Sequence, residues 1–325
     1  MIADETAPVL TNDYLRSVWE FMTPLLVPTS LVRSDPLDEA LGAQVVLACE
    51  TFQRTGSFKF RAAYNLVRSI PNEEIVSASS GNFGQAVALA CRLLSRRCTV
   101  VMPTAASRVK IAAVRSYGAT VDLVDTAQVS RSERVRQLMA DRPGAFYAPA
   151  YDDTRVVAGN STLGREIFAS GMDFDAVLVP VGGGGLVSGV VSARDAFGAS
   201  TRVFGAEPLL ANDAARSLHA GSIIANDVEP PTLADGARTI SLGAVTWPIV
   251  QRGVETIVEV PEETIAEATR LLFRCANLKA EPTGALAVGA VLQERERFAG
   301  QRVCCVVSGG NVDEDTYAAI LRGEL

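Results

Sequence analysis

Residues 176–189, AVLVPVGGGGLVSG, join an apolar run to four consecutive glycines and then to a second apolar segment. The first run is typical of a buried strand. The glycines lack Cβ atoms, so successive backbone N–H groups can wrap a phosphate at a helix start. The stretch spells neither GxGxxG nor the Lys-Ser/Thr ending of a P-loop, so it favours other phosphate ligands over dinucleotides and nucleoside triphosphates. It predicts a strand, a phosphate-binding loop and a helix, with a merely flexible turn as the alternative.

The same order recurs along the chain, where β-rich apolar runs alternate with amphipathic stretches. The runs fall at residues 44–49, 75–79, 98–103, 120–125, 176–181, 202–207 and 302–308. Alternation of this kind predicts an α/β fold with parallel sheets covered by helices. The runs between about 75 and 148 form a compact group. We therefore expect a small domain of residues 71–153, inserted into a large domain built from residues 1–70 and 154–325.

Composition narrows the classes of partner. The chain has 325 residues, 48% of them hydrophobic, and a net charge of -7, which opposes nucleic acid binding and favours a small-molecule substrate. The first residues are acidic where a signal peptide is basic, and no apolar stretch reaches membrane-spanning length, so we expect a cytoplasmic enzyme. The six cysteines show no CxxC spacing and are predicted to be reduced core residues. The single histidine, His219, is predicted to lie on the surface.

A lysine in the segment TGSFKFR, residues 55–61, is a candidate for covalent chemistry. Lys59 lies between Phe58 and Phe60, next to a glycine turn. Desolvation by such neighbours lowers the pKa of a lysine and yields the free amine that Schiff-base formation needs. The alternative is an amphipathic lysine whose ammonium group reaches out of an aromatic patch to water.

Two further motifs follow apolar runs. Residues 79–85, SSGNFGQ, place small polar residues before a helix, where unpaired N–H groups bind anions such as a substrate carboxylate. An ordinary helix cap is the alternative. Residues 307–311, VSGGN, place a hydroxyl group at the mouth of a buried strand.

Taken together and in this order, the motifs resemble the fold-type II enzymes that use pyridoxal phosphate (PLP), and are similar to threonine/serine dehydratases and serine racemase. The likeness runs through TGSFKFRAA, SSGNFGQAVALA, VVAGNSTLGREI, VPVGGGGLVSG, PTLADGA, EPTGA and VVSGGN. It implies a two-lobed fold of the tryptophan synthase β type and PLP as cofactor. It also implies a homodimer, and β-elimination (dehydration and then hydrolytic deamination) of a β-hydroxy amino acid to give a 2-oxo acid and ammonia.

The resemblance also assigns roles to residues. Lys59 holds the cofactor as a Schiff base and then acts as general base. The expected cofactor contacts are Phe58, Lys59, Asn82, Gly182, Gly183, Gly184, Gly185, Leu186, Gly236, Glu281 and Ser308. The expected substrate contacts are Ser79, Ser80, Gly81, Phe83 and Tyr151. Ser308 faces the pyridine nitrogen, and because its hydroxyl is neutral, elimination is favoured over transamination.

Two features of the resemblance leave alternatives open. Ser80 matches the second acid/base of serine racemase, so amino-acid racemisation is an alternative activity. Glu207, Ala211 and Asp213 match the spacing of a Mg²⁺ or Ca²⁺ site in serine racemase, and an acidic helix start is the alternative there. β-Replacement, as in cysteine synthases, and a non-catalytic PLP-binding protein are further alternatives.

The chain departs from the family pattern at Phe83, where the relatives usually have histidine, and Tyr151 falls at another substrate-facing position. These aromatic residues favour a bulkier or less ordinary β-hydroxy amino acid than threonine or serine, such as a compound of hydroxyectoine breakdown.

Overall fold

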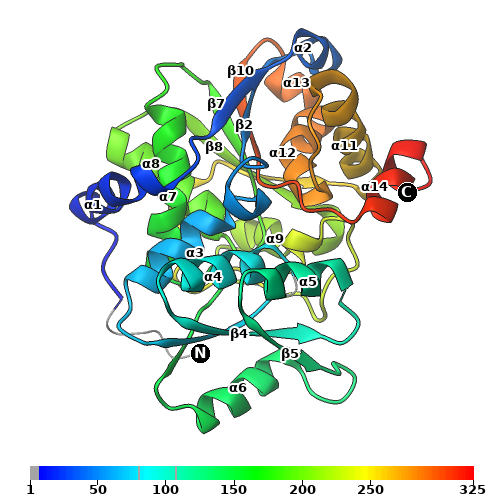
Figure 1. The fold of residues 1–325 in the computed structure, drawn as a ribbon. Coiled ribbons are helices and arrows are strands. Elements are labelled where there is room, and N and C mark those ends of the chain that lie inside the picture. The colour runs from blue at the N-terminus through cyan, green and yellow to red at the C-terminus, as the bar shows by residue number, and fades with distance from the viewer. Residues whose placement is uncertain (1–6, 80, 107) are drawn as a thin grey trace.

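The computed structural model describes residues 7–79, 81–106 and 108–325. In these ranges the strands form two separate sheets, one of six strands and one of four (Figure 1). Both sheets are built mainly from parallel pairs, as the alternation of apolar runs and amphipathic stretches predicts.

The larger sheet has the order β1-β2-β10-β7-β8-β9, and only the β1–β2 pair is antiparallel among the described strands. Its central strand β10 has the sequence RVCCVV and is buried from its second residue onward, which suits a strand covered on both faces. The strands are β1 (Ser30–Arg33), β2 (Gln44–Cys49), β7 (Ala176–Pro180), β8 (Arg202–Pro208), β9 (Ile257–Val260) and β10 (Arg302–Val307).

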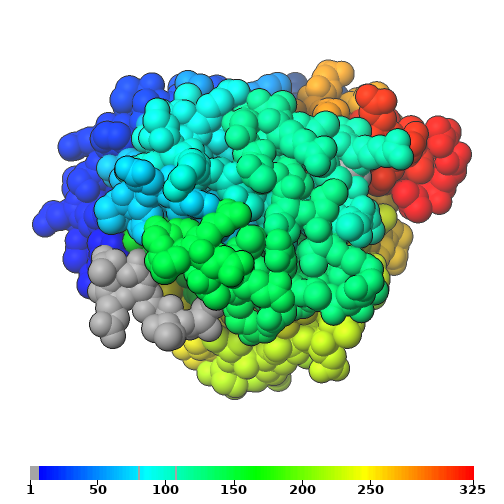
Figure 2. Space-filling view, turned by 60° about the horizontal axis from the view of Figure 1, so that its bottom comes forward, coloured from blue at the N-terminus to red at the C-terminus, as the bar shows by residue number. Residues whose placement is uncertain are grey.

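The smaller sheet has the order β5-β4-β3-β6, and all its pairs are parallel. Its strands are β3 (Glu74–Ala78), β4 (Arg97–Pro103), β5 (Thr120–Val124) and β6 (Ala145–Tyr147). Figure 2 shows that this part of the chain, in cyan to green, covers the centre of one face of the molecule. The seven predicted runs are all strands. The described strands that the sequence did not predict, β1, β6 and β9, are only four, three and four residues long.

Helices cover both faces of each sheet. In the larger sheet, α12 packs on β7 to β10 and α8 packs on β7 and β8; in the smaller, α4 and α5 lie opposite α6. The helices are α1 (Asn12–Met22), α2 (Asp35–Leu41), α3 (Lys59–Arg68), α4 (Asn82–Leu93), α5 (Arg108–Ser116), α6 (Arg131–Asp141), α7 (Thr154–Phe168), α8 (Gly185–Phe197), α9 (Asp213–Ala220), α10 (Trp247–Gly253), α11 (Glu262–Ala276), α12 (Pro282–Gln293), α13 (Arg295–Phe298) and α14 (Glu314–Arg322). Short 3₁₀ turns are η1 (Thr23–Leu25), η2 (Arg54–Gly56), η3 (Leu209–Ala211) and η4 (Asp235–Ala237).

Helices α3 and α4 lie between the two sheets (Figure 1). They pack on each other, and α3 also packs on α7. Their apolar side chains share one core with α1 and the smaller sheet, which includes Phe60, Leu66, Val87 and Val100. Because α3 begins at Lys59 and α4 begins at Asn82, this core fixes the starting points of two of the predicted motifs.

A buried ion cluster anchors the first turn of α3. The guanidinium group of Arg61 is fully buried and donates to both carboxylate oxygens of Glu50, at 2.7 and 2.9 Å. It also donates to Glu166 of α7 at 3.0 Å and to the hydroxyl group of Thr29 at 2.8 Å. The cluster therefore joins α3 to the end of β2, to the segment before β1 and to α7.

The predictions for cysteine and histidine are confirmed. All six cysteines are free thiols, five of them buried and Cys275 half-buried. His219 is exposed on α9. In the described ranges, no helix combines the length and the apolar character needed to cross a bilayer.

Candidate functional site

Lys59 lies half-buried at the start of α3. Its Nζ donates to the carbonyl oxygen of Ala150 at 3.1 Å and lies 4.8 Å from the ring centre of Phe58 and 5.7 Å from that of Phe83. Burial lowers the pKa of Lys59 to about 8, although the nearby carboxyl group of Glu281 acts in the opposite direction. Lys59 therefore loses its proton more readily than an exposed lysine does, as the TGSFKFR motif predicts.

The TGSFKFR motif of residues 55–61 and the VSGGN motif of residues 307–311 are tied together by backbone contacts. The amide of Phe58 donates to the carbonyl oxygen of Ser308 at 3.0 Å, and Ser57 forms a β-bridge with Gly309. The hydroxyl oxygens of Ser57 and Ser308 are buried and have no hydrogen-bond partner among the described residues. A buried hydroxyl group normally has a partner, so the orphaned Ser308 Oγ fits a bound polar atom such as a ring nitrogen.

Asn82 links the SSGNFGQ motif of residues 79–85 to Glu281 and to the VSGGN motif. Its Nδ2 donates to Glu281 Oε1 at 2.7 Å, and its Oδ1 accepts from Asn311 Nδ2 at 2.8 Å. Burial, and then the negative charge of Asp235, raise the pKa of Glu281 to about 8. The carboxyl group of Glu281 is close enough to Lys59 for its ionised form to raise the pKa of that lysine.

The glycine loop connects β7 to α8. Gly184 has a φ of 86°, a conformation that favours glycine. A Cβ atom on Gly183 would lie 2.3 Å from ring atoms of Tyr151, and one on Gly185 would lie 3.1 Å from the same residue. The amides of residues 182–185 donate to no carbonyl group of another described residue. Free N–H groups at the start of a helix, here one of 13 residues, are suited to bind an anion.

Gly236 lies beside the glycine loop, as the family resemblance implies. Its carbonyl oxygen is 3.3 Å from the position of a Cβ on Gly182, and its amide donates to Thr283 Oγ1 at 2.9 Å. The following residue, Ala237, is equally close to Gly182. Leu186, the other loop residue predicted to hold the cofactor, is buried in the core beneath it.

We expect Gly183→Ala to weaken cofactor binding by about tenfold or more, because its methyl group would displace the ring of Tyr151 and with it the loop. Fluorescence titration of the apoprotein with PLP measures the effect. Gly144→Ala is the control, since a Cβ there meets nothing within 4 Å. Equal affinities for the two variants would contradict this interpretation of the loop.

The structure describes only in part the residues that are predicted to face the substrate. Ser80 lies outside the described residues, so the racemase alternative stays a prediction. The Oγ of Ser79 accepts from the amide of Gly81 at 3.3 Å. Phe83 is buried, with its ring near Lys59, and Tyr151 packs on the glycine loop. Burial, and then the negative charge of Asp152, raise the pKa of Tyr151 to about 12, so its hydroxyl group stays protonated.

The predicted cation residues lie on β8 and at the start of α9. Both oxygens of Glu207 accept from the backbone amides of the two residues after Asp213, at 3.0 and 2.9 Å. Asp213 Oδ1 accepts from Asn226 at 2.8 Å, whereas Asp213 Oδ2 is buried and has no hydrogen-bond partner in the described ranges. Ala211 is buried beside them. Among the described residues no group of three or more His, Cys, Asp or Glu side chains is placed to hold a metal ion.

Sequence reasoning missed two cationic residues that form ion pairs between distant segments. Lys110 of α5 lies 2.5 Å from Asp235 of η4. Arg131, at the start of α6, lies 2.8 Å from Glu229. Each of these ion pairs joins the smaller sheet's helices to a segment that follows β8, so neither could be read from local sequence. The sequence offers one clue to these residues. Each cation lies in the first turn of a helix that follows a strand of the smaller sheet.

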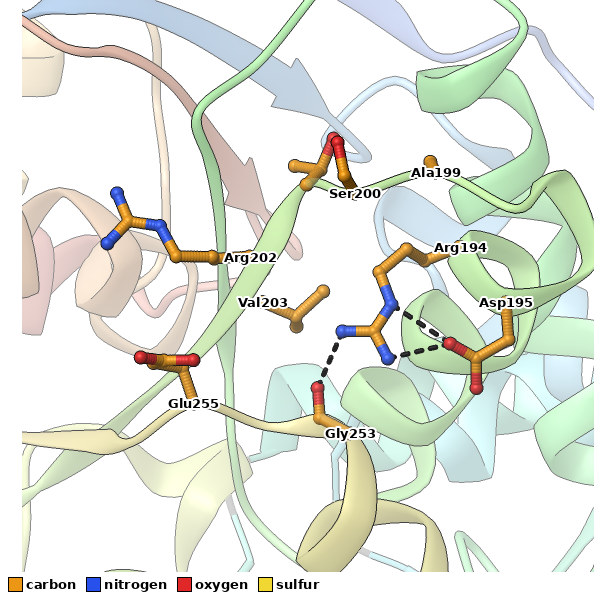
Figure 3. A pocket seen from close by; sticks show the side chains of 9 residues that line it. Arg194, Asp195, Ala199, Ser200, Arg202, Val203, Gly253 and Glu255 are labelled. Atoms are coloured by element: carbon orange, nitrogen blue, oxygen red, sulfur yellow. Dashed lines mark hydrogen bonds and ion pairs between the residues drawn. The ribbon is translucent and has the colours of Figure 1, made fainter.

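A surface pocket of about 320 Å³ lies away from this site (Figure 3). It is lined by Arg194, Asp195, Arg202, Glu255 and their neighbours, and Arg194 is already bonded to Asp195 and to the carbonyl oxygen of Gly253. The pocket lies at the amino end of β8. Ligands of open α/β sheets lie beyond the opposite, carboxyl ends of the strands, so we assign it no part in the chemistry.

Lys59, the free amides of the glycine loop and the orphaned Ser308 hydroxyl group together match the three polar features of PLP, namely an aldehyde carbon, a phosphate and a ring nitrogen. The residues present therefore fit this cofactor. The amine is easily deprotonated, the helix start favours an anion, and the buried hydroxyl group lacks a partner among the described residues.

Comparison with known proteins agrees with this fit. The family model described as pyridoxal-phosphate dependent enzyme matches residues 22–309. The L-threo-3-hydroxyaspartate ammonia-lyase of Pseudomonas sp is 40% identical over 91% of this chain and 93% of its own length. The β-hydroxyaspartate dehydratase of Paracoccus denitrificans is 36% identical over 94% and 97%.

Solved structures give the same result. The threonine deaminase of T.th. superposes with a TM-score of 0.87 at 40% identity, covering 93% of this chain and 98% of that one. Maize serine racemase superposes with a TM-score of 0.89 at 30% identity, covering 96% and 97%. The chain belongs to the family of pyridoxal-phosphate-dependent enzymes.

Proposed function

We propose that this protein removes water across Cα–Cβ of a β-hydroxy amino acid with a second carboxylate, of the 3-hydroxyaspartate type. The unsaturated product takes up water again on hydrolysis, so that a 2-oxo acid and ammonia are released. The observation that carries the elimination chemistry is the amine of the half-buried Lys59, whose pKa is about 8, at the meeting point of the four motifs. The names of several similar relatives, hydroxyaspartate ammonia-lyase and dehydratase, support the substrate class.

Each polar group of the site has a task in this proposal. PLP, when bound, supplies the electron sink that makes the substrate Cα–H acidic. The amides of residues 182–185 would hold its phosphate, and Ser308 and Asn82 would contact its ring. The Nζ of Lys59 accepts the Cα proton, because burial keeps its pKa near that of a general base at neutral pH. The neutral hydroxyl group of Ser308 leaves the ring nitrogen without a carboxylate partner, which favours elimination over transamination.

We propose Arg131 as the residue that binds the second carboxylate. Helix α6 follows β5, so its first residue lies at the carboxyl end of the smaller sheet, where ligands of such sheets bind. Burial raises the pKa of Tyr147, and the positive charge of Arg131 opposes this rise, so the two side chains are close enough to interact. Tyr147 lies at the end of β6, close in sequence to Ala150 and Tyr151. Its partner Glu229 has a side chain that is 52% exposed, so a substrate carboxylate can replace it at small cost.

A substrate panel tests the proposed function. We expect L-threo-3-hydroxyaspartate to give 2-oxo acid and ammonia with a higher kcat/KM than L-threonine or L-serine. Arg131→Gln should raise KM for the dicarboxylate by about 10- to 100-fold, the value of one charge-assisted hydrogen bond, and should leave KM for L-serine almost unchanged. The control is Arg136→Gln, on the exposed side of the same helix. A wild-type preference for threonine, with equal effects of Arg131→Gln on all substrates, would refute the assignment.

We also propose a divalent-cation site at Glu207, Asp213 and the carbonyl oxygen of Ala211. Burial and the charge of Asp213 raise the pKa of Glu207, and burial raises the pKa of Asp213 to about 6. A bound cation would stabilise the ionised form of both carboxyl groups. Saturating CaCl₂ or MgCl₂ should then raise Tm relative to EDTA, with about 2.7 kcal/mol of stabilisation at a hundredfold excess over Kd. Asp213→Asn should remove the increase. An unchanged Tm in the wild type would leave these residues as an acidic helix start.

For the whole chain we propose two lobes, residues 71–153 and residues 1–70 with 154–325, in a cytoplasmic homodimer. The division into two sheets supports the lobes, since β3 to β6 all fall within the smaller segment. Sedimentation equilibrium tests the dimer.

A further inference from the structure

Lys110 forms ion pairs that connect a helix of the smaller sheet to segments that follow strands of the larger sheet. It lies on α5, which packs against α4 and β5 of the smaller sheet. Its Nζ is 2.5 Å from Asp235 Oδ2 and 3.9 Å from Asp313 Oδ2, and both acids belong to segments that follow the larger sheet's strands. One ammonium group thus joins three segments that are far apart in sequence.

Both acids are next to the cofactor site. Asp235 directly precedes Gly236, whose carbonyl oxygen lies beside the glycine loop. Asp313 comes two residues after Asn311, which donates to Asn82 at 2.8 Å. Any movement of α5 away from these acids would therefore act on the two loops that border the cofactor.

The charges around Lys110 favour this contact. Burial lowers the pKa of Lys110, but Asp235, Asp313 and Glu281 together outweigh burial and raise it, so the ammonium group stays charged. Without it, Asp235 and the buried Glu281, whose negative charges repel each other, would lose a nearby compensating cation. The side chain of Lys110 is 21% exposed and those of its two partners are 35% and 34% exposed, so water screens the attraction only in part.

We infer that Lys110 is a latch that holds the smaller-sheet half of the molecule against η4 and residues 308–313, and so keeps the two loops that border the cofactor in place. It is a positioning residue, because it acts through Asp235 and Asp313 and not on the reacting atoms. The latch goes beyond the proposed function and does not depend on the identity of the substrate.

Hydrogen–deuterium exchange of the holoenzyme tests the latch without any substrate. We expect Lys110→Met to speed amide exchange in residues 233–238 and 308–313 by about fivefold, because the ion pair no longer holds these segments against α5. The matched control is Arg134→Met, which removes an ion pair of 2.7 Å between Arg134 and Asp122 that lies entirely within the smaller-sheet half. Its exchange in the two segments should equal that of the wild type.

Charge exchange separates a latch from a general loss of packing. The double variant Lys110→Asp with Asp235→Lys restores the attraction and should return exchange in residues 233–238 toward the wild-type rate, whereas each single change should not. If the double variant does not fold, Lys110→Arg replaces it, since a guanidinium group can reach the same acids. Wild-type exchange in Lys110→Met, or no recovery in the variant that restores the charge, would overturn the latch. Amide exchange is measured without turnover. The result therefore tests the latch independently of the hydroxyaspartate proposal.

Discussion

Lys59→Ala is expected to lower 2-oxo acid release by about 10³-fold or more, because it removes both the covalent anchor of the cofactor and the general base. The absorption band of the lysine-bound cofactor should disappear with it. The chain contains only two other lysines, Lys110, whose amine is paired with Asp235, and Lys279, which is exposed. Steady-state assay of 2-oxo acid, together with the absorption spectrum of each purified variant, measures both effects.

The chain offers a matched control for this experiment. Lys279 is exposed, so Lys279→Ala should keep both the band and the turnover. A wild-type protein that shows no band when supplied with PLP would contradict the assignment of Lys59. A band that survives Lys59→Ala would place the cofactor on another amine.

Arg61→Met is expected to destabilise the fold by about 3–5 kcal/mol, because the two carboxylate oxygens of Glu50 would stay buried without their cation. Methionine fills similar volume, so lost charge pairing and not a cavity dominates the effect. The free energy of unfolding from urea denaturation measures it. Glu50→Gln in the same background should recover part of the loss, since it removes the uncompensated charge.

An exposed ion pair serves as the comparison. Arg33 and Asp38 lie 3.2 Å apart, and the Arg33 side chain is 56% exposed, so Arg33→Met should change stability by less than about 1 kcal/mol. If Arg61→Met were as mild as Arg33→Met, the cluster would contribute little to the anchoring of α3.

The apolar runs were sufficient to predict most of the fold. Buried parallel strands such as β2 and β10 are continuous apolar segments, and that pattern is visible in one dimension. Strand β6 was missed because three residues are too few to show an alternating or continuous apolar pattern. Its place at the sheet edge comes from its pairing with β3. The domain bounds inferred from the grouping of strands are compatible with the two sheets but remain a proposal.

The site was predictable where one segment carries its chemistry. The Lys59 and glycine-loop motifs are local, and each could be recognised from a few consecutive residues. Lys110 and Arg131 could not be found in this way, because their meaning depends on Asp235 and Glu229, which lie 125 and 98 residues further along the chain. An ion pair between such distant segments leaves no periodic signal in either of them.

The order of strands in the larger sheet has a consequence for biosynthesis. Strand β10 is the last described strand of the chain, yet it lies in the middle of the sheet, between β2 and β7. During translation, β2 and β7 therefore emerge from the ribosome long before the strand that pairs with both of them. Until then each presents an unpaired apolar edge, which is a site for misassociation. The nascent chain also cannot complete the proposed cofactor site before β10 is synthesised, since Ser308 directly follows that strand.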